Sequence, residues 1–86
     1  MDFNRERTLE EKASLAAELA IKIRQAVKSN DLQLYETIDS DARAYFKRAD
    51  YLLYGQANDI LKANPEISQI ALALRVLEWG KKKDIQ

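Results

Sequence analysis

The fold is decided by residues 32–63, which read LQLYETIDSDARAYFKRADYLLYGQANDILKA. Many apolar side chains of this stretch recur mostly at intervals of three or four residues, the spacing that places them on one face of an α-helix. They are Leu32, Tyr35, Ile38, Ala42, Tyr45, Phe46, Ala49, Leu52, Leu53, Ile60 and Ala63. Because the stripe keeps its phase throughout, the sequence predicts one long helix over about 31–63, roughly 48 Å in length.

A break at Ser40-Asp41 is the alternative to a continuous helix. Ser40 could act as the N-cap of a new helix, which would divide the stretch and give four helices in total. The Glu or Gln that completes a capping box three residues later is absent, because Arg43 stands there. We therefore expect the helix to continue.

A shorter helix precedes the long one. Thr8 followed by Glu11 matches a capping box and predicts a helix over about 8–29. Asn30 or Asp31 can cap the long helix, because either side chain accepts a hydrogen bond from a first-turn amide. The connection is so short that the two helices are expected to be antiparallel neighbours.

A third helix is expected over about 65–79. Pro65 suits the first position of a helix, and Gly80 suits the left-handed conformation that often ends one. The fold class is therefore all-α: a three-helix, hairpin-type bundle with one long central helix. It forms a single domain over 1–80, followed by a basic tail over 81–86.

The composition fits a small helical domain with no strong electrostatic field. The 86 residues are 47% hydrophobic and 33% charged, and 14 basic and 14 acidic residues give a net charge of zero. This balance gives no long-range attraction to nucleic acid or to an anionic membrane. No apolar run approaches the ~18 residues of a membrane span, and the charged N-terminal residues lack a signal-peptide core, so we expect a cytoplasmic protein.

The residue types offer little for catalysis or metal binding. Histidine and cysteine are both absent, which removes the usual proton shuttle near neutral pH, the thiol nucleophile and the usual zinc ligands. Glu36 and Asp39 could share a divalent cation, but two carboxylates are too few for a site. We expect a protein that is not an enzyme and binds no cofactor or metal.

The third helix carries two apolar faces. The face expected to pack inward consists of Ile67, Ile70, Ala71, Leu74 and Leu77, and the opposite face consists of Leu72, Val76 and Trp79. A terminal helix needs only one apolar face, so the second is expected to bind another chain, most simply in a homodimer. The alternatives are that this helix is wedged between the other two, or that Trp79 folds onto the tail.

A second candidate surface lies on the outer side of the long helix. Tyr51 and Tyr54 point away from the main stripe there, next to Lys47 and Arg48. Tyrosine and arginine are enriched at binding hot spots, because they combine buried area with a polar group. Packing of both tyrosines against the edge of the long helix is an equally good explanation.

Protein binding is the function that these features favour. The sequence predicts a small interaction module, such as an adaptor, an assembly subunit or an inhibitor, acting through an exposed apolar helix face. The alternative is a small nucleic-acid-binding dimer, in which Lys81, Lys82 and Lys83, with Arg5 and Arg7 at the other end of the chain, contact phosphates.

Overall fold

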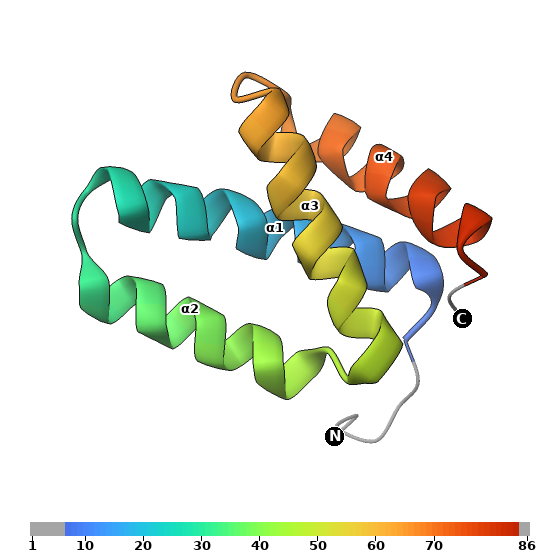
Figure 1. Ribbon diagram of the computed structural model, residues 1–86, viewed down its shortest axis with the longest axis horizontal. Coiled ribbons are helices and arrows are strands. Elements are labelled where there is room, and N and C mark those ends of the chain that lie inside the picture. The colour runs from blue at the N-terminus through green and yellow to red at the C-terminus, as the bar shows by residue number, and fades with distance from the viewer. Residues whose placement is uncertain (1–6, 85–86) are drawn as a thin grey trace.

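The computed structural model describes residues 7–84, apart from the side chain of Arg48, and this part of the chain is helical with no strand (Figure 1). The α-helices are α1 (Leu9–Lys28), α2 (Leu32–Tyr45), α3 (Tyr51–Ala63) and α4 (Gln69–Lys82), and a 3-10 turn, η1 (Arg48–Asp50), precedes α3. The all-α class is confirmed, but these helices number four where three were expected. None of those described is long and apolar enough to cross a membrane.

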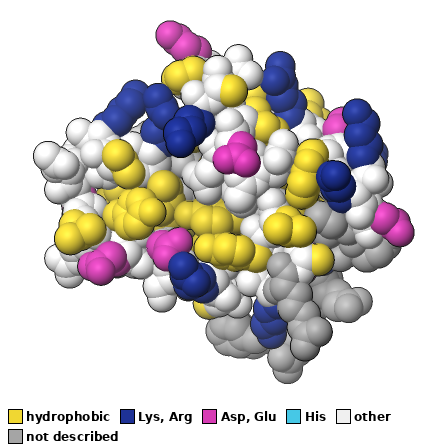
Figure 2. All heavy atoms as spheres, in the orientation of Figure 1, with side chains coloured by type: hydrophobic (Ala, Val, Ile, Leu, Met, Phe, Trp, Pro, Cys, Tyr) yellow, Lys and Arg dark blue, Asp and Glu magenta, His cyan; other side chains and the backbone are white. Residues whose placement is uncertain are grey.

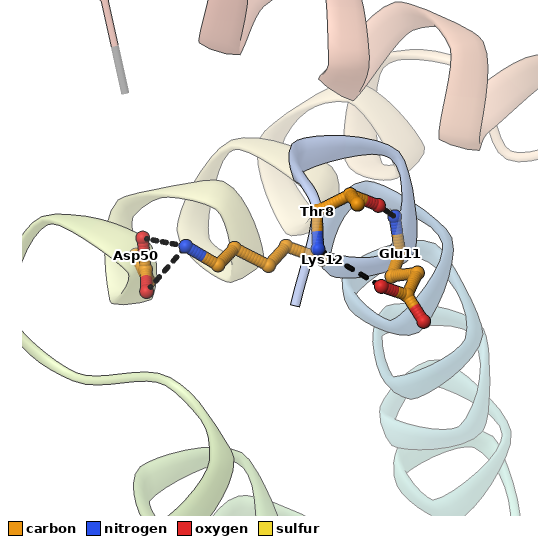
Figure 3. Close-up of polar contacts among 4 residues, drawn as sticks. All are labelled: Thr8, Glu11, Lys12 and Asp50. Atoms are coloured by element: carbon orange, nitrogen blue, oxygen red, sulfur yellow. Dashed lines mark hydrogen bonds and ion pairs between the residues drawn. The ribbon is translucent and has the colours of Figure 1, made fainter. Parts of the chain in front are cut away.

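The first helix begins as the sequence predicts. Thr8 Oγ1 accepts a hydrogen bond from the Glu11 amide at 3.1 Å, and the Thr8 amide donates to Glu11 Oε1 at 2.9 Å, which completes the capping box (Figure 3). Much of the buried face of α1 is alanine, and these small side chains let neighbouring helices approach closely. As a result α1 packs against each of the other three helices.

A tight connection joins α1 to α2. Asn30 adopts a left-handed conformation with φ of 55°, and Asp31 then caps α2 by accepting a hydrogen bond from the Leu34 amide at 3.0 Å. The chain therefore reverses direction within a few residues, and α2 runs antiparallel to α1 (Figure 1). The predicted helical hairpin is confirmed.

The prediction of one long helix over 31–63 is wrong, and so is the alternative position of the break. The chain leaves the helix at Phe46, whose φ and ψ of −102° and 123° are those of extended backbone, and not at Ser40-Asp41. The longest dimension of the molecule is 34 Å, whereas the continuous helix would be ~48 Å long. The break lets α3 turn back and cross α1, which covers apolar side chains that a straight helix would leave in water.

An ion pair fixes the start of α3 against α1. Lys12 Nζ lies 3.1 Å from both carboxylate oxygens of Asp50, the last residue of η1 (Figure 3). The two side chains are only 14% and 24% exposed, so the contact is shielded from solvent. It connects residues 38 positions apart and stabilises the turn that the sequence stripe did not reveal.

The last helix begins later than expected. The chain forms a turn at Pro65 and Glu66, and α4 begins at Gln69. Ser68 is the N-cap, because its hydroxyl accepts a hydrogen bond from the Ala71 amide at 3.1 Å. A serine that can satisfy a first-turn amide thus sets the start of this helix, and the prediction of Pro65 as its first residue is wrong.

The end of the last helix also differs from the prediction. Gly80 is buried inside α4, which continues to Lys82, so 81–86 is not a separate tail from its first residue. A methyl group added at Gly80 would lie 3.1 Å from Leu53 Cδ2 and 3.1 Å from Leu9 Cδ1. The absence of a side chain at this position serves close packing of α4 against α1 and α3, not a helix end.

Candidate interaction surfaces

The two apolar faces of α4 are opposite to their predicted orientations. Leu72 and Val76 are fully buried in the core, and Trp79 packs half-buried against it. Because α4 packs against both α1 and α3, this face is covered within the chain, as in the alternative that placed the helix between two others. Leu72 and Val76 are thus not available to a partner, and the prediction that they are exposed is wrong.

Two of the side chains on the face of α4 expected to pack inward are exposed instead. Ile70 is 76% exposed and Leu74 is 58% exposed, and they lie one helical turn apart. Ile67 and Leu77 are half-buried, since both pack partly against the core. We call Ile70 and Leu74 the outer α4 face.

The tyrosine patch is largely internal. Tyr54 is 5% exposed, and its ring stacks on Phe46 with a centroid distance of 6.2 Å. Burial raises the pKa of Tyr54 to about 12, because it disfavours the charged phenolate. Tyr51 is half-buried, 5.6 Å from the Tyr54 ring, so both rings pack within the chain, although not against the edge of one long helix.

A basic residue that was not expected beside these tyrosines contacts one of them. Lys47 is exposed, and the side chain of Arg48 lies outside the described residues. Instead, the Arg43 guanidinium lies 5.8 Å from the Tyr51 ring centre, and Arg43 Nε donates to Asp39 Oδ2 at 3.0 Å. This pairing holds Arg43 over the ring. The hydrogen bond to Asp39 is also the largest cause of the raised pKa of the Arg43 guanidinium.

A hollow that the sequence did not indicate lies between α1 and α2 at their connection. It has a volume of about 260 Å³ and is lined by Ala26, Val27, Asn30, Asp31, Leu32 and Tyr35. Leu32 is 70% exposed and Tyr35 is 37% exposed, although the helical stripe placed both inside. Figure 2 shows hydrophobic side chains forming a band across this part of the surface.

A larger hollow of about 480 Å³ lies on α1 and α2. Charged side chains of both signs line it, among them Arg7, Glu18, Lys22 and Asp41. The Arg7 guanidinium lies over the Tyr45 ring at 5.1 Å, and Lys22 pairs with Glu18 at 3.0 Å. Because these charges pair largely with protein groups, the hollow offers no clear chemistry for a ligand.

The described residues contain no cluster of three or more potential metal ligands. Glu36 is exposed, and Asp39 pairs with Arg43. Asp39 is one of the two carboxylates that could share a cation, and it is already paired with the Arg43 guanidinium.

Basic residues from both ends of the chain come to the same end of the molecule. The contact of Leu9 with Gly80 places the start of α1 beside the end of α4, where Lys81, Lys82 and Lys83 are exposed. Lys81 lies 3.9 Å from Glu78, and Arg7 is engaged with Tyr45. Arg5 lies outside the described residues.

No protein-family model, curated protein or solved structure matches this chain.

Proposed function

We propose that this chain is a small, non-enzymatic protein-interaction module that binds through the outer α4 face. The observation that carries the proposal is the exposure of Ile70 and Leu74, 76% and 58%, side by side on one helix. Complete burial of such a side chain contributes about 1.5–3 kcal/mol. A partner that covers both side chains therefore gains binding free energy without any rearrangement of the core.

A second copy of the chain is the partner that we propose first. Leu74 lies near the middle of α4, so a two-fold axis beside it lets two α4 helices pack antiparallel and cover the same residues on both copies. Arg75 and Glu78 are exposed on the same helix and have opposite charges. Together with the net charge of zero, they leave no strong repulsion between two copies.

Sedimentation velocity over a wide range of protein concentration tests this proposal. We expect the wild-type chain to shift from monomer to dimer as concentration rises, and an Ile70→Lys/Leu74→Lys variant to stay monomeric. Leu52→Lys is the matched control, because Leu52 is 56% exposed on α3. Monomers throughout, or dimers that persist in the double variant, would contradict the proposal.

Nucleic-acid binding is the second candidate function, and the observation that favours it is the run of exposed lysines Lys81, Lys82 and Lys83 at the end of α4, beside the start of α1. Phosphate contacts give an affinity that falls steeply as salt rises, whereas an apolar face is much less sensitive to salt. Fluorescence anisotropy with labelled single-stranded and double-stranded DNA distinguishes the two functions. Salt-sensitive binding that disappears when all three lysines are changed to Ala would favour nucleic acid over the protein-binding proposal.

A further inference from the structure

A second exposed apolar surface lies away from α4, where α1 and α2 meet their connection. Val27 on α1 is 58% exposed, and Leu32 and Tyr35 on α2 are 70% and 37% exposed. These side chains line the hollow of about 260 Å³ described above. They stand on two antiparallel helices, so the surface is a groove with two walls and not a single helix face.

From the hollow, one edge of α2 continues for the length of a short helix. Leu32, Tyr35, Asp39 and Arg43 follow one another at intervals of three or four residues, so they lie along one edge of α2. From Leu32 to Arg43 this edge is ~17 Å long, or about three helical turns. Tyr51 on α3 lies at its far end, where the Arg43 guanidinium is 5.8 Å from the ring centre. We call the surface from Val27 and Leu32 to Tyr51 the α1–α2 groove.

The two walls of the α1–α2 groove differ in charge. Along α2, Asp31 and Glu36 are exposed, and Asp39 is already paired with Arg43. On α1, Arg24 precedes Val27 by three residues, the spacing of neighbours on a helix surface, and Lys28 is exposed immediately after Val27. Figure 2 shows Lys and Arg side chains above the hydrophobic band, with acidic side chains and one basic side chain below it.

The charges of the basic wall are not paired with other described residues. Neither Arg24 nor Lys28 forms an ion pair there, and Lys28 is exposed. On the opposite wall, Glu36 likewise pairs with no described residue. Each wall therefore presents a charge that an oppositely charged side chain of a partner can neutralise.

We propose that the α1–α2 groove binds an amphipathic helix of another protein, with basic side chains on the flank facing α2 and acidic side chains on the flank facing α1. The apolar ridge of that helix covers Val27, Leu32 and Tyr35, as in the general helix-in-groove mode of recognition. A helix with one sign of charge on both flanks would meet like charges at one wall, which disfavours it. This partner is distinct from the second copy that we propose for the outer α4 face.

A designed peptide of about 18 residues provides the probe. It carries leucines on one face, with lysines on one flank and glutamates on the other, and its binding to the full chain is followed by anisotropy of a fluorescein label. Peptides with lysines on both flanks or glutamates on both flanks are the comparison. A peptide with exchanged flanks is not a control, because it can enter the groove in the reverse direction. We expect the mixed peptide to bind at least about tenfold more tightly than either comparison peptide.

Variants of exposed residues locate the site without disturbing the core. We expect Leu32→Ser/Tyr35→Ser to weaken binding of the mixed peptide at least about tenfold, because both side chains line the hollow. Leu52→Ser is the matched control and should leave the affinity unchanged. The Ile70→Lys/Leu74→Lys variant should also leave it unchanged, which separates this proposal from the one for α4.

Three results would overturn the proposal. One is equal affinity, or no binding, for the three peptides. Another is that the Ile70→Lys/Leu74→Lys variant loses peptide binding while the Leu32→Ser/Tyr35→Ser variant keeps it. The third is a wild-type dimer that becomes monomeric in Leu32→Ser/Tyr35→Ser, since it would show that a second copy of the chain occupies the groove.

Discussion

The contact between α3 and α4 at Leu53 and Gly80 leads to a specific prediction about stability. Leu53 is fully buried, and its Cδ2 atom lies 3.1 Å from where a methyl group on Gly80 would stand. Leu9 Cδ1 lies at the same distance from that point. Replacing Leu53 by Ala therefore opens a cavity next to a residue that has no side chain to fill it.

We expect Leu53→Ala to lower the free energy of unfolding by about 3–5 kcal/mol, the upper part of the range for buried leucines. A chain of this length has a total stability of roughly 4–13 kcal/mol, so the loss is a large fraction. At about 4–8 °C per kcal/mol, the melting temperature should fall by at least ~12 °C.

Gly80→Ala should have different effects on stability in the two backgrounds. In the wild-type chain, the improved helix propensity of ~1 kcal/mol is offset by crowding against Leu53 and Leu9. In the Leu53→Ala background, one of these close contacts is gone and the new methyl group fills part of the cavity. We expect Gly80→Ala to be near neutral alone and to restore about 1–2 kcal/mol in the double variant.

Urea denaturation of the four proteins, followed by circular dichroism and by Trp79 fluorescence, completes the double-mutant cycle. A cost below about 1 kcal/mol for Leu53→Ala would refute its place in the core. An effect of Gly80→Ala that is the same in both backgrounds would refute the direct contact between α3 and α4.

Other predictions concern the caps, the ion pair and the buried phenol. Asp50→Ala should lower the free energy of unfolding by about 1–3 kcal/mol in urea denaturation, because it removes a shielded ion pair with Lys12; no loss would mean that the pair does not hold the turn. Thr8→Ala should lower the free energy of unfolding by ~1 kcal/mol in the same measurement. Ser14→Ala, at an exposed position within α1, is the control, and an equal loss in both variants would argue against the capping box. Because the pKa of Tyr54 is about 12 in the folded chain and 10.0 in the reference state, the unfolded chain loses the proton first, so stability should fall between about pH 10 and 12. Tyr54→Phe should reduce that fall, and an unchanged pH profile would count against burial of the phenol.

Local signals in the sequence predict the first half of the fold well. Thr8, Glu11 and Asp31 act through hydrogen bonds to backbone amides within three residues, so their roles are visible without knowledge of the rest of the chain. The break after Tyr45 leaves no comparable signal. Buried residues on its two sides, Phe46 and Leu53, continue the same helical phase, and the cause of the break is tertiary: α3 must return over α1.

The orientation of α4 could not be derived from its own sequence for a related reason. Both of its faces are apolar, so periodicity alone does not tell which one packs inward. The buried face is selected by Gly80, which allows Leu9 and Leu53 to approach that side of the helix. The same limit applies to the α1–α2 groove, since Leu32 and Tyr35 carry the helical pattern of core residues and yet lie beyond what α1 covers.

The most direct test of the proposed interaction through the outer α4 face is disulfide formation by a single introduced cysteine. The chain contains no cysteine, so Leu74→Cys introduces the only thiol. A two-fold axis beside position 74 brings the two thiols within disulfide range, where the Cα atoms are ~4.4–6.8 Å apart. Under mild oxidation we expect Leu74→Cys to form a covalent dimer at a concentration where Leu52→Cys, at an exposed site on α3, stays monomeric. Equal dimer yields from the two variants, or none from Leu74→Cys, would contradict the account.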